Sequence, residues 1–362
     1  MTSTRVVTGL LVTLAFCGSP RVAAAQAPFT VGTATAAAGQ MAVGAIEVAA
    51  GSDAALSVPV IVVNGARPGP VLALLAGAHG TEYASIIALE KLPAAVDAAA
   101  LSGTLVIVPL LNVPSFARIV PHLNPVDGKN MNRMYPGKPD GTQTERASYA
   151  ITRQVVEKSD HLIDFHGGDI DENLRPYSYW QKTGRAAQDA ASLGMVLAFG
   201  LDHIIITTGR PTDPADSRYL ENTATTRGKP SITVEAGRAG TVEPEDVAAL
   251  IDGTLSVMRH LKMLPGAATP VAHPVWIDRL ADVASDHAGI FYPAVERGSY
   301  VAAGTTIGRV TDYVGRPLAE VRSAAAGVVL YVRAVPTVNK GDAIASIGVV
   351  GKAPDGVPGA VR

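Results

Sequence analysis

The sequence predicts an α/β protein: a mixed, mainly parallel sheet sandwiched by helices, followed by a smaller C-terminal all-β domain. Apolar runs of strand length alternate with segments of helical periodicity as far as residue 261, which is typical of an α/β sandwich. After Lys262 the chain has short apolar runs and many glycines, with no long helical pattern. A chain of 362 residues is long enough for two domains that each have a core.

The predicted elements of the α/β part follow in chain order. Residues 28 to about 56 show the weak alternation of edge strands. Continuous apolar runs, typical of strands covered on both faces, lie at residues 71–76 and 105–111. Further strands are predicted over residues 57–63, 161–165, 203–207 and 231–234. Helical spacing predicts helices over residues 83–92, 143–158, 186–199, 217–227 and 244–261.

The all-β part begins after a predicted linker, residues 264–270. We therefore predict domains over residues 28–263 and 271–350. Residues 301–310 and 338–347 share their apolar spacing and the position of a glycine, Gly304 in one and Gly341 in the other. Two equivalent hairpin units predict a small β-sandwich with an internal repeat.

The overall charge excludes some classes of partner. The formal net charge is −2 and charged residues make up 17% of the chain. This balance gives no electrostatic case for binding nucleic acid or an anionic membrane surface.

The N-terminus has the pattern of a signal peptide, predicted over residues 1–27. Arg5 supplies the positive charge, residues 6–17 are mostly apolar, and Ala25-Gln26-Ala27 offers small residues at the usual cleavage spacing. The apolar stretch is too short for a membrane span, so we expect an exported protein, periplasmic or secreted. Cys17, the single cysteine, would allow a lipid anchor instead, but the bulky Phe16 before it argues against this. Without Cys17 the mature chain has no disulfide and no thiolate metal site.

Two segments point to a metal centre. His79 and Glu82 stand three residues apart in a glycine-rich turn after the apolar run 71–76, at the start of a predicted helix. This spacing puts both side chains on one side of the helix. His166 ends a second strand and is followed by two glycines. Two imidazoles and a carboxylate are the ligand set of an open catalytic zinc site, in which a water takes the fourth position.

Glu235 and the segment 124–137 supply the remaining candidates. Glu235 ends the strand predicted over residues 231–234. A carboxylate at that edge of the sheet can take a proton from a metal-bound water and pass it to a leaving nitrogen. The segment 124–137 is rich in polar residues and contains Asn132 and Arg133, and an arginine with a neighbouring amide can bind a carboxylate.

In combination, these motifs resemble the succinylglutamate desuccinylase/aspartoacylase family of the zinc carboxypeptidase-like superfamily. The resemblance runs from about Ser57 to about Ile347, and its motifs are His79 with Glu82, Asn130-Met131-Asn132-Arg133, Asp-Phe-His-Gly-Gly around His166, and Val-Glu-Ala-Gly around Glu235. It implies one Zn²⁺ bound by His79, Glu82 and His166. It also implies that Asn132 and Arg133 hold a substrate carboxylate and that Glu235 is the general base and acid.

One position departs from the family pattern. Many members carry an arginine three residues before the proline of the Pro-x-Asp-Gly stretch, where it helps to stabilise the oxyanion, and here that residue is His122. A histidine can donate a hydrogen bond to an oxyanion, but its charge depends on pH. The nearby Arg118 is an alternative donor to the oxyanion. His122 can also be interpreted as an ordinary loop residue with no catalytic role.

Other polar residues are weaker candidates. Asp164 points to the same side of its strand as His166 and could orient it. Tyr177 and Tyr179 fit either a pocket wall or a packing role, and Glu145 with Arg146 fits a structural pair. The remaining histidines have no ligand-like surroundings and are interpreted as structural or exposed: His161, His203, His260, His273 and His287.

The predicted function is a zinc-dependent amide hydrolase that removes an acyl group from an N-acyl amino acid or a similar small amide with a carboxylate. The alternatives are a zinc carboxypeptidase that acts on short or cell-wall peptides and a non-catalytic binding protein. A pocket capped by the C-terminal domain would favour small substrates, and an open groove would favour peptides. No pattern in the sequence specifies the acyl group or the oligomeric state.

Overall fold

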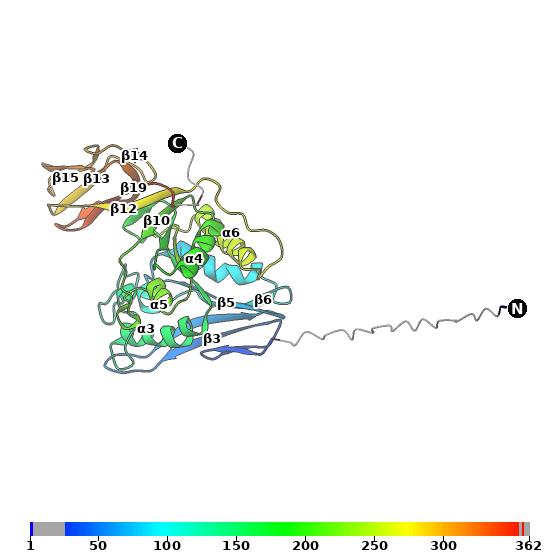
Figure 1. Cartoon of the computed structure of the whole chain (residues 1–362). Coiled ribbons are helices and arrows are strands. Elements are labelled where there is room, and N and C mark those ends of the chain that lie inside the picture. The colour runs from blue at the N-terminus through cyan, green and yellow to red at the C-terminus, as the bar shows by residue number, and fades with distance from the viewer. Residues whose placement is uncertain (3–25, 355–356, 358–362) are drawn as a thin grey trace.

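The fold is described from a computed structural model that covers residues 1–2, 26–354 and 357 (Figure 1). In this part of the chain, thirteen strands form one large mixed sheet. Twelve follow the order β14-β17-β19-β12-β10-β9-β11-β7-β5-β6-β4-β3, and β8 pairs with β17. Their bounds are β3 Gln40–Val48, β4 Leu56–Asn64, β5 Arg67–Ala76, β6 Ser102–Val108, β7 His161–His166, β8 Glu172–Leu174, β9 Tyr177–Gln181, β10 His203–Thr207, β11 Ser231–Glu235, β12 Val275–Ala284, β14 Tyr300–Val301, β17 Gly327–Arg333 and β19 Ala343–Val350.

The centre of the sheet is mainly parallel, as predicted. Strand β5 lies parallel to both β6 and β7, β7 lies parallel to β11, and β10 lies parallel to β9 and β12. The apolar run in β5 shows why this part is buried on both faces. Leu72 and Leu74 belong to one hydrophobic cluster, and Ala73 and Leu75 belong to the other. Successive side chains of a strand point to opposite faces, so a continuous apolar run serves two cores.

Helices cover both faces of the sheet (Figure 1). The first cluster contains side chains of α1 (Tyr83–Lys91), α4 (Ala186–Phe199) and α6 (Pro244–His260). The second contains side chains of α3 (Gln143–Gln154) and α5 (Leu220–Thr226), together with the small sheet formed by β1 (Phe29–Val31) and β2 (Ala34–Ala36). A short helix, α2 (Val113–Arg118), follows β6. The predicted sandwich is therefore confirmed.

The structure corrects several element boundaries and adds elements. The strand predicted to reach residue 111 ends at Val108, because Pro109 has no N–H to donate to a sheet. The helix predicted from residue 217 begins at Leu220. The helix predicted to reach residue 158 ends at Gln154, and a 3₁₀ turn follows at Val156–Lys158. Helix α2 and strands β8 and β9 lie outside the predicted elements, because their segments of three to six residues are too short to show a periodic pattern.

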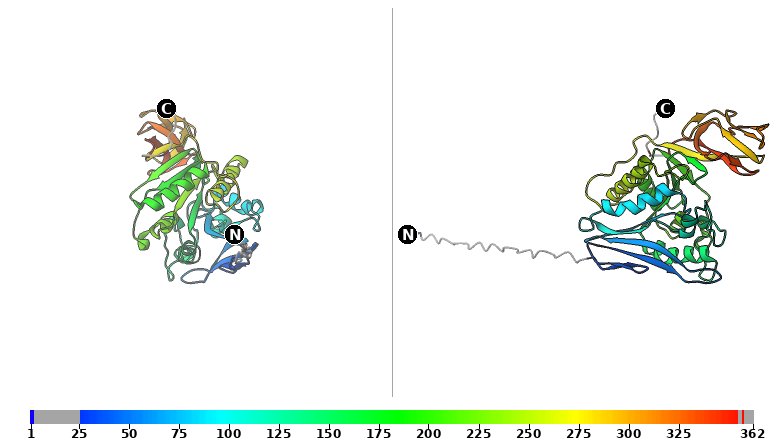
Figure 2. Two further views of the ribbon diagram at one scale, coloured as in Figure 1. Left: turned by 45° about the vertical axis from the view of Figure 1, so that its right-hand side comes forward. Right: turned by 180° about the vertical axis from the view of Figure 1, so that it is seen from behind.

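The C-terminal strands continue the large sheet (Figures 1 and 2), since β12 pairs with β10 on one side and β19 on the other. A second, antiparallel sheet contains β16 (Pro317–Arg322), β15 (Thr306–Thr311), β13 (Gly289–Pro293) and β18 (Thr337–Val338). A separate cluster of apolar side chains contains residues of these strands and of β12, β17 and β19. Each sequence repeat forms a short strand, a turn with a glycine at positive φ, and a longer strand: β14–β15 around Gly304 and β18–β19 around Gly341. The domain boundaries at residues 263 and 271 stay a prediction.

Residues 3–25 lie outside the described part of the chain. They contain Arg5, Cys17 and most of the predicted signal peptide. Among the described residues, no helix has the length and apolar character needed to cross a membrane.

Glu145 fixes the start of α3 to the polar segment 124–137. Its side chain accepts a hydrogen bond from Lys129 Nζ at 2.8 Å and completes a capping box with Thr142. The predicted pairing of Glu145 with Arg146 is wrong, because Arg146 instead donates to Asp53 at 2.7 Å. The hydrogen bond from Lys129, with those from Thr142, lowers the pKa of Glu145 to about 2.

Replacing Glu145 with Ala is expected to lower the free energy of unfolding by about 1–2 kcal/mol at pH 7. Because the pKa of this carboxyl is lower in the folded chain, its contribution is present above the unfolded value of 4.5 and is lost as the pH falls toward about 2. Urea unfolding at pH 7 and pH 3 measures both effects. The matched control is E157A, which breaks an exposed pair with Arg153 and should cost less than about 0.5 kcal/mol. Equal losses for the two variants at pH 7 would contradict the proposed anchor.

Candidate active site

Three neighbouring parallel strands bring the predicted site residues together. In the register of the sheet, Ala76 of β5 pairs with Phe165 of β7, and His166 of β7 pairs with Glu235 of β11. The turn that follows β5 carries His79 and Glu82. The ends of all three strands thus meet at one edge of the sheet, which is where open α/β folds bind ligands.

Two glycines make this close approach possible. A Cβ atom at Gly80 would lie 2.2 Å from the backbone nitrogen of Phe116, and one at Gly167 would lie 2.3 Å from the carbonyl oxygen of Ala236. No side chain fits at either distance. The glycines that marked these turns in the sequence are therefore required by packing next to the site.

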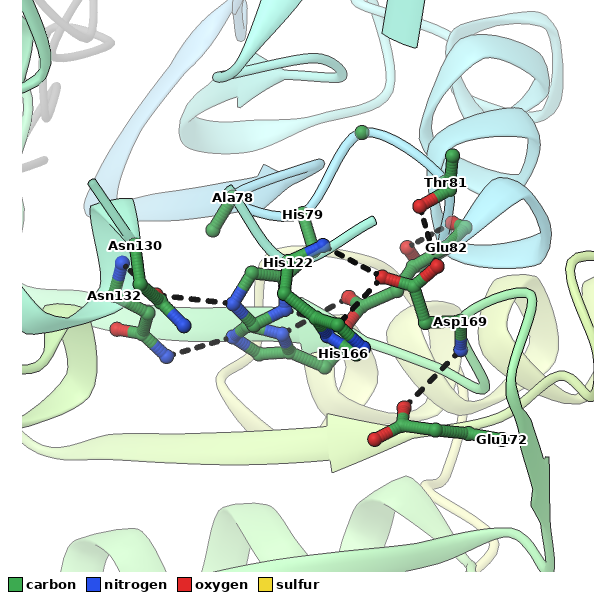
Figure 3. Close-up of polar contacts among 12 residues, drawn as sticks. Ala78, His79, Thr81, Glu82, His122, Asn130, Asn132, His166, Asp169 and Glu172 are labelled. Carbon is green, nitrogen blue, oxygen red and sulfur yellow. Dashed lines mark hydrogen bonds and ion pairs between the residues drawn. The ribbon is translucent and has the colours of Figure 1, made fainter. Parts of the chain in front are cut away.

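The predicted metal ligands converge (Figure 3). One ligand atom from each of His79, Glu82 and His166 lies within 4.8 Å of the others. The Glu82 carboxylate lies between the imidazoles, with Oε1 2.6 Å from His79 Nδ1 and Oε2 2.9 Å from His166 Nδ1. Glu82 and His166 are buried. The geometry therefore brings the three residues of the predicted ligand set into one cluster.

Neighbouring side chains orient both imidazoles. His79 Nε2–H donates to Asn130 Oδ1 at 3.1 Å, which leaves Nδ1 free to face Glu82. His166 Nε2 lies 3.3 Å from Asp164 Oδ1 and 3.0 Å from the Asn132 amide. A carboxylate behind a histidine is a common arrangement at metal centres, where it fixes the ring.

The donor set fits a zinc ion by its chemistry. Two imidazole nitrogens and one carboxylate oxygen form a common protein ligand set of catalytic zinc. Asp164 gives further support, since it is fully buried and its carboxylate makes a long contact, 3.3 Å from Oδ1 to His166 Nε2. A cation at the neighbouring cluster would compensate this buried charge.

The electrostatics of the cluster agree with a cation site. Burial of the Glu82 carboxyl acts to raise its pKa, but the charges and hydrogen bonds of His166 and His79 outweigh burial and lower it to about 2. The His166 pKa lies well above its ordinary value, because the charges and hydrogen bonds of Asp164 and Glu82 outweigh the opposing effect of burial. The carboxylates of Glu82 and Asp164 therefore favour positive charge at this cluster.

Glu235 lines the same cavity as the cluster. Burial, together with the charges of Glu82 and Glu172, raises its pKa well above the ordinary value for a glutamate. A carboxylate with a raised pKa is a better proton acceptor. Glu172 is a second, partly buried carboxyl in the cavity, and desolvation raises its pKa to about 7.

His122 also lines the cavity, with its ring centroid 5.8 Å from that of His79. Its Nε2–H donates to Asp171 at 2.9 Å, and its backbone N–H donates to Asp169 at 3.0 Å. Burial opposes the charged form, but the hydrogen bond to Asp171 and the charges of Asp169 and Glu172 raise the His122 pKa to about 9. The imidazole is therefore positively charged at neutral pH. Arg118, the alternative donor, is not among the described residues that line the cavity.

Asn132 and Arg133 lie beside the metal-ligand cluster. The Asn132 amide accepts a hydrogen bond from the Leu220 N–H at 3.0 Å and faces His166 on its other side. The Arg133 guanidinium is 4.7 Å from the centre of the Tyr219 ring, and its Nη1 donates to the Asn132 carbonyl at 2.7 Å. Both residues border the cavity, and their role in binding a carboxylate stays a prediction.

The cavity has a volume of about 460 Å³ and lies partly under the C-terminal strands. Its wall includes Tyr177 and Tyr179, whose strand β9 runs beside β11.

The sequence patterns did not predict the following lining residues: Glu172, Leu174, Arg210, Tyr219, Glu221, Thr233, Leu280, Asp282, Tyr331, Ala343 and Ser346. For Glu172 a signal existed, since it follows the glycines after His166. The five lining residues from β12, β17 and β19 have no local sequence pattern that predicts a role in the site, because only the order of strands in the sheet brings them to the cavity. None of the five histidines interpreted as structural or exposed is among the described lining residues.

Comparisons with known proteins agree with this geometry. The succinylglutamate desuccinylase/aspartoacylase catalytic domain matches residues 68–261. The N-alpha-acetyl-L-2,4-diaminobutyric acid deacetylase of Halomonas elongata is 33% identical over 304 residues, which are 82% of this chain and 86% of that protein.

Solved structures show the same fold. The product-bound ectoine utilization protein EutE (DoeB) of Ruegeria pomeroyi is 29% identical, with a TM-score of 0.74 over 82% of this chain and 90% of that one. A succinylglutamate desuccinylase from Silicibacter sp. TM1040 is 25% identical, with a TM-score of 0.77 over 86% of this chain and 95% of that one. The chain belongs to the succinylglutamate desuccinylase/aspartoacylase family, whose activity is the hydrolysis of amides by deacylation.

Proposed function

We propose that this protein is an exported, zinc-dependent deacylase that removes an acyl group from an N-acyl amino acid. The observation that carries the proposal is the convergence of His79, Glu82 and His166 in a cavity that Glu235 and Arg133 also line. Export rests on the signal-peptide pattern of residues 1–27.

His79, Glu82 and His166 would hold one zinc ion, which when bound supplies Lewis acidity toward water and the amide carbonyl. Glu235 takes the proton of the attacking water and later gives it to the leaving nitrogen. The positive charge of His122, whose ring nitrogens face Asp171 and Asp169, would stabilise the negative charge that develops on the carbonyl oxygen. Arg133 binds the carboxylate of the substrate, which holds the amide bond in line with Glu235.

The shape of the cavity favours a small substrate. Its volume is about 460 Å³, and side chains of β12, β17 and β19 form part of its wall, so the C-terminal strands bound the cavity on one side. The Halomonas relative is a deacetylase of a small N-acetyl amino acid. N-acetyl amino acids are therefore the first substrates to test.

A hydrolysis screen of the purified protein tests the proposal. The substrates are N-acetyl amino acids, N-succinyl amino acids and short peptides. The release of acetate, succinate or free amino acid is measured with and without a chelator. We expect turnover of an N-acyl amino acid that the chelator abolishes. Cleavage of peptides alone would identify a carboxypeptidase, and tight binding with no turnover of any substrate would identify a binding protein.

A further inference from the structure

Glu221 is a buried carboxyl in the cavity that the proposed mechanism does not use. It lies in the first turn of α5, is 6% exposed and borders the cavity. Burial raises its pKa to about 7 although Arg210 opposes this. A carboxyl in such a position needs a positively charged partner when it is ionised.

Arg210 is the one cation within 4 Å of Glu221 among the described residues, and it compensates the carboxylate only in part. Its Nη2 is 3.5 Å from Glu221 Oε1, longer than the roughly 2.7–2.9 Å of a strong charge-assisted hydrogen bond. The Arg210 guanidinium lies over the Tyr219 ring, 3.8 Å from the ring centre, and its Nε is buried without a hydrogen-bond partner. Arg210 thus contacts the ring closely and the carboxylate only loosely.

Glu221 lies next to the residues assigned to the substrate carboxylate. The N–H of Leu220, the preceding residue, donates to Asn132. Tyr219, one residue further back, has the Arg133 guanidinium over its ring as well as that of Arg210. This part of the cavity therefore presents one carboxylate close to Arg133.

We propose that Glu221 binds an ammonium group on the side chain of the leaving amino acid, with Arg210 positioning the carboxylate. The substrate class would be N-acyl amino acids with a short, amine-bearing side chain, whose carboxylate faces Arg133 and whose ammonium faces Glu221. This inference rests on the proposed function. It also agrees with the diamino acid named in the substrate of the Halomonas relative.

The main rival is an acidic side chain bound by Arg210. In that case Glu221 would serve only to position the arginine, and an N-acyl aspartate or glutamate would be preferred. The two possibilities predict opposite charge preferences for one subsite, so a matched substrate series separates them.

The experiment compares three N-acetyl amino acids of similar side-chain length: L-2,4-diaminobutyrate, L-norvaline and L-aspartate. For the unaltered protein we expect kcat/KM to be highest for the diaminobutyrate derivative. In E221Q the ratio of kcat/KM for diaminobutyrate over norvaline should fall by on the order of 10²-fold. Calorimetric titration with free L-2,4-diaminobutyrate should show a matching loss of affinity.

The control is D282N, which removes another carboxylate of the cavity wall, an exposed one on β12. It should leave the diaminobutyrate-to-norvaline ratio within about threefold. The zinc content and melting temperature of E221Q show whether the variant is intact.

Turnover of none of the three would count against the proposed function itself. Turnover with aspartate or norvaline preferred, or a ratio lowered by D282N and not by E221Q, would overturn only the role of Glu221. If E221Q does not fold, the substrate preference of the unaltered protein and the diaminobutyrate-to-norvaline ratio of D282N still test the role proposed for Glu221.

Discussion

E235Q is expected to lower kcat for hydrolysis by about 10²–10⁴-fold while the zinc content stays unchanged. Glutamine keeps the size of the side chain but cannot accept a proton from water or return it to the leaving nitrogen. Glu235 lies at the end of β11 beside His166 but is not in the ligand cluster, so the change should leave metal binding intact. Product release and metal analysis of the same preparation measure both effects.

The matched control for this prediction is E172Q. Like Glu235, Glu172 is partly buried, lines the cavity and has a raised pKa, but we assign no proton transfer to it. We expect E172Q to retain at least a tenth of the activity. The reverse result, in which E172Q loses activity and E235Q stays active, would identify Glu172 as the general base.

Removal of the metal by a chelator is expected to abolish hydrolysis, and addition of one equivalent of Zn²⁺ should restore it. Cobalt or manganese should restore part of the activity, because the same ligand types accept these ions. The chelated protein should stay folded, since Glu82 then remains paired with both imidazoles at 2.6 and 2.9 Å. Circular dichroism and activity, followed through one cycle of removal and restoration, check these expectations.

Substitution of a predicted ligand distinguishes loss of the metal site from a general effect of the chelator on the protein. E82Q removes the ligand between the two histidines and should weaken zinc binding by at least about 10²-fold. H273N changes an exposed histidine that does not border the cavity and should bind zinc normally. Full activity of a preparation with less than about a tenth of an equivalent of any divalent metal would refute metal dependence.

Much of the site follows from local patterns in the sequence. His79, Glu82, His166 and Glu235 each follow or end an apolar run, and a strand can be predicted from such a run without knowing its neighbours. The glycines beside them marked the turns, and the structure adds that packing requires glycine at residues 80 and 167. The family motifs then narrowed the chemistry to amide hydrolysis.

The choice between His122 and Arg118 needed the tertiary structure. Both lie in the same polar stretch of sequence, and nothing local distinguishes them. In the fold, His122 faces Asp169 and Asp171, which follow His166 in the chain. Those two carboxylates help to raise the His122 pKa to about 9, so contacts between distant segments give this imidazole a charge that the local sequence does not specify.

The sequence by itself determined the α/β class, the positions of the central strands β4 to β7, β10 and β11, and the candidate residues that follow or end three of them, because each of these follows from a local pattern. Only the tertiary structure decided that β12, β17 and β19 continue the sheet and wall the cavity, and that Glu221 and Arg210 lie beside Arg133. The physical reason is that strand order brings together side chains far apart in the chain, whereas periodicity records only which face of an element is buried.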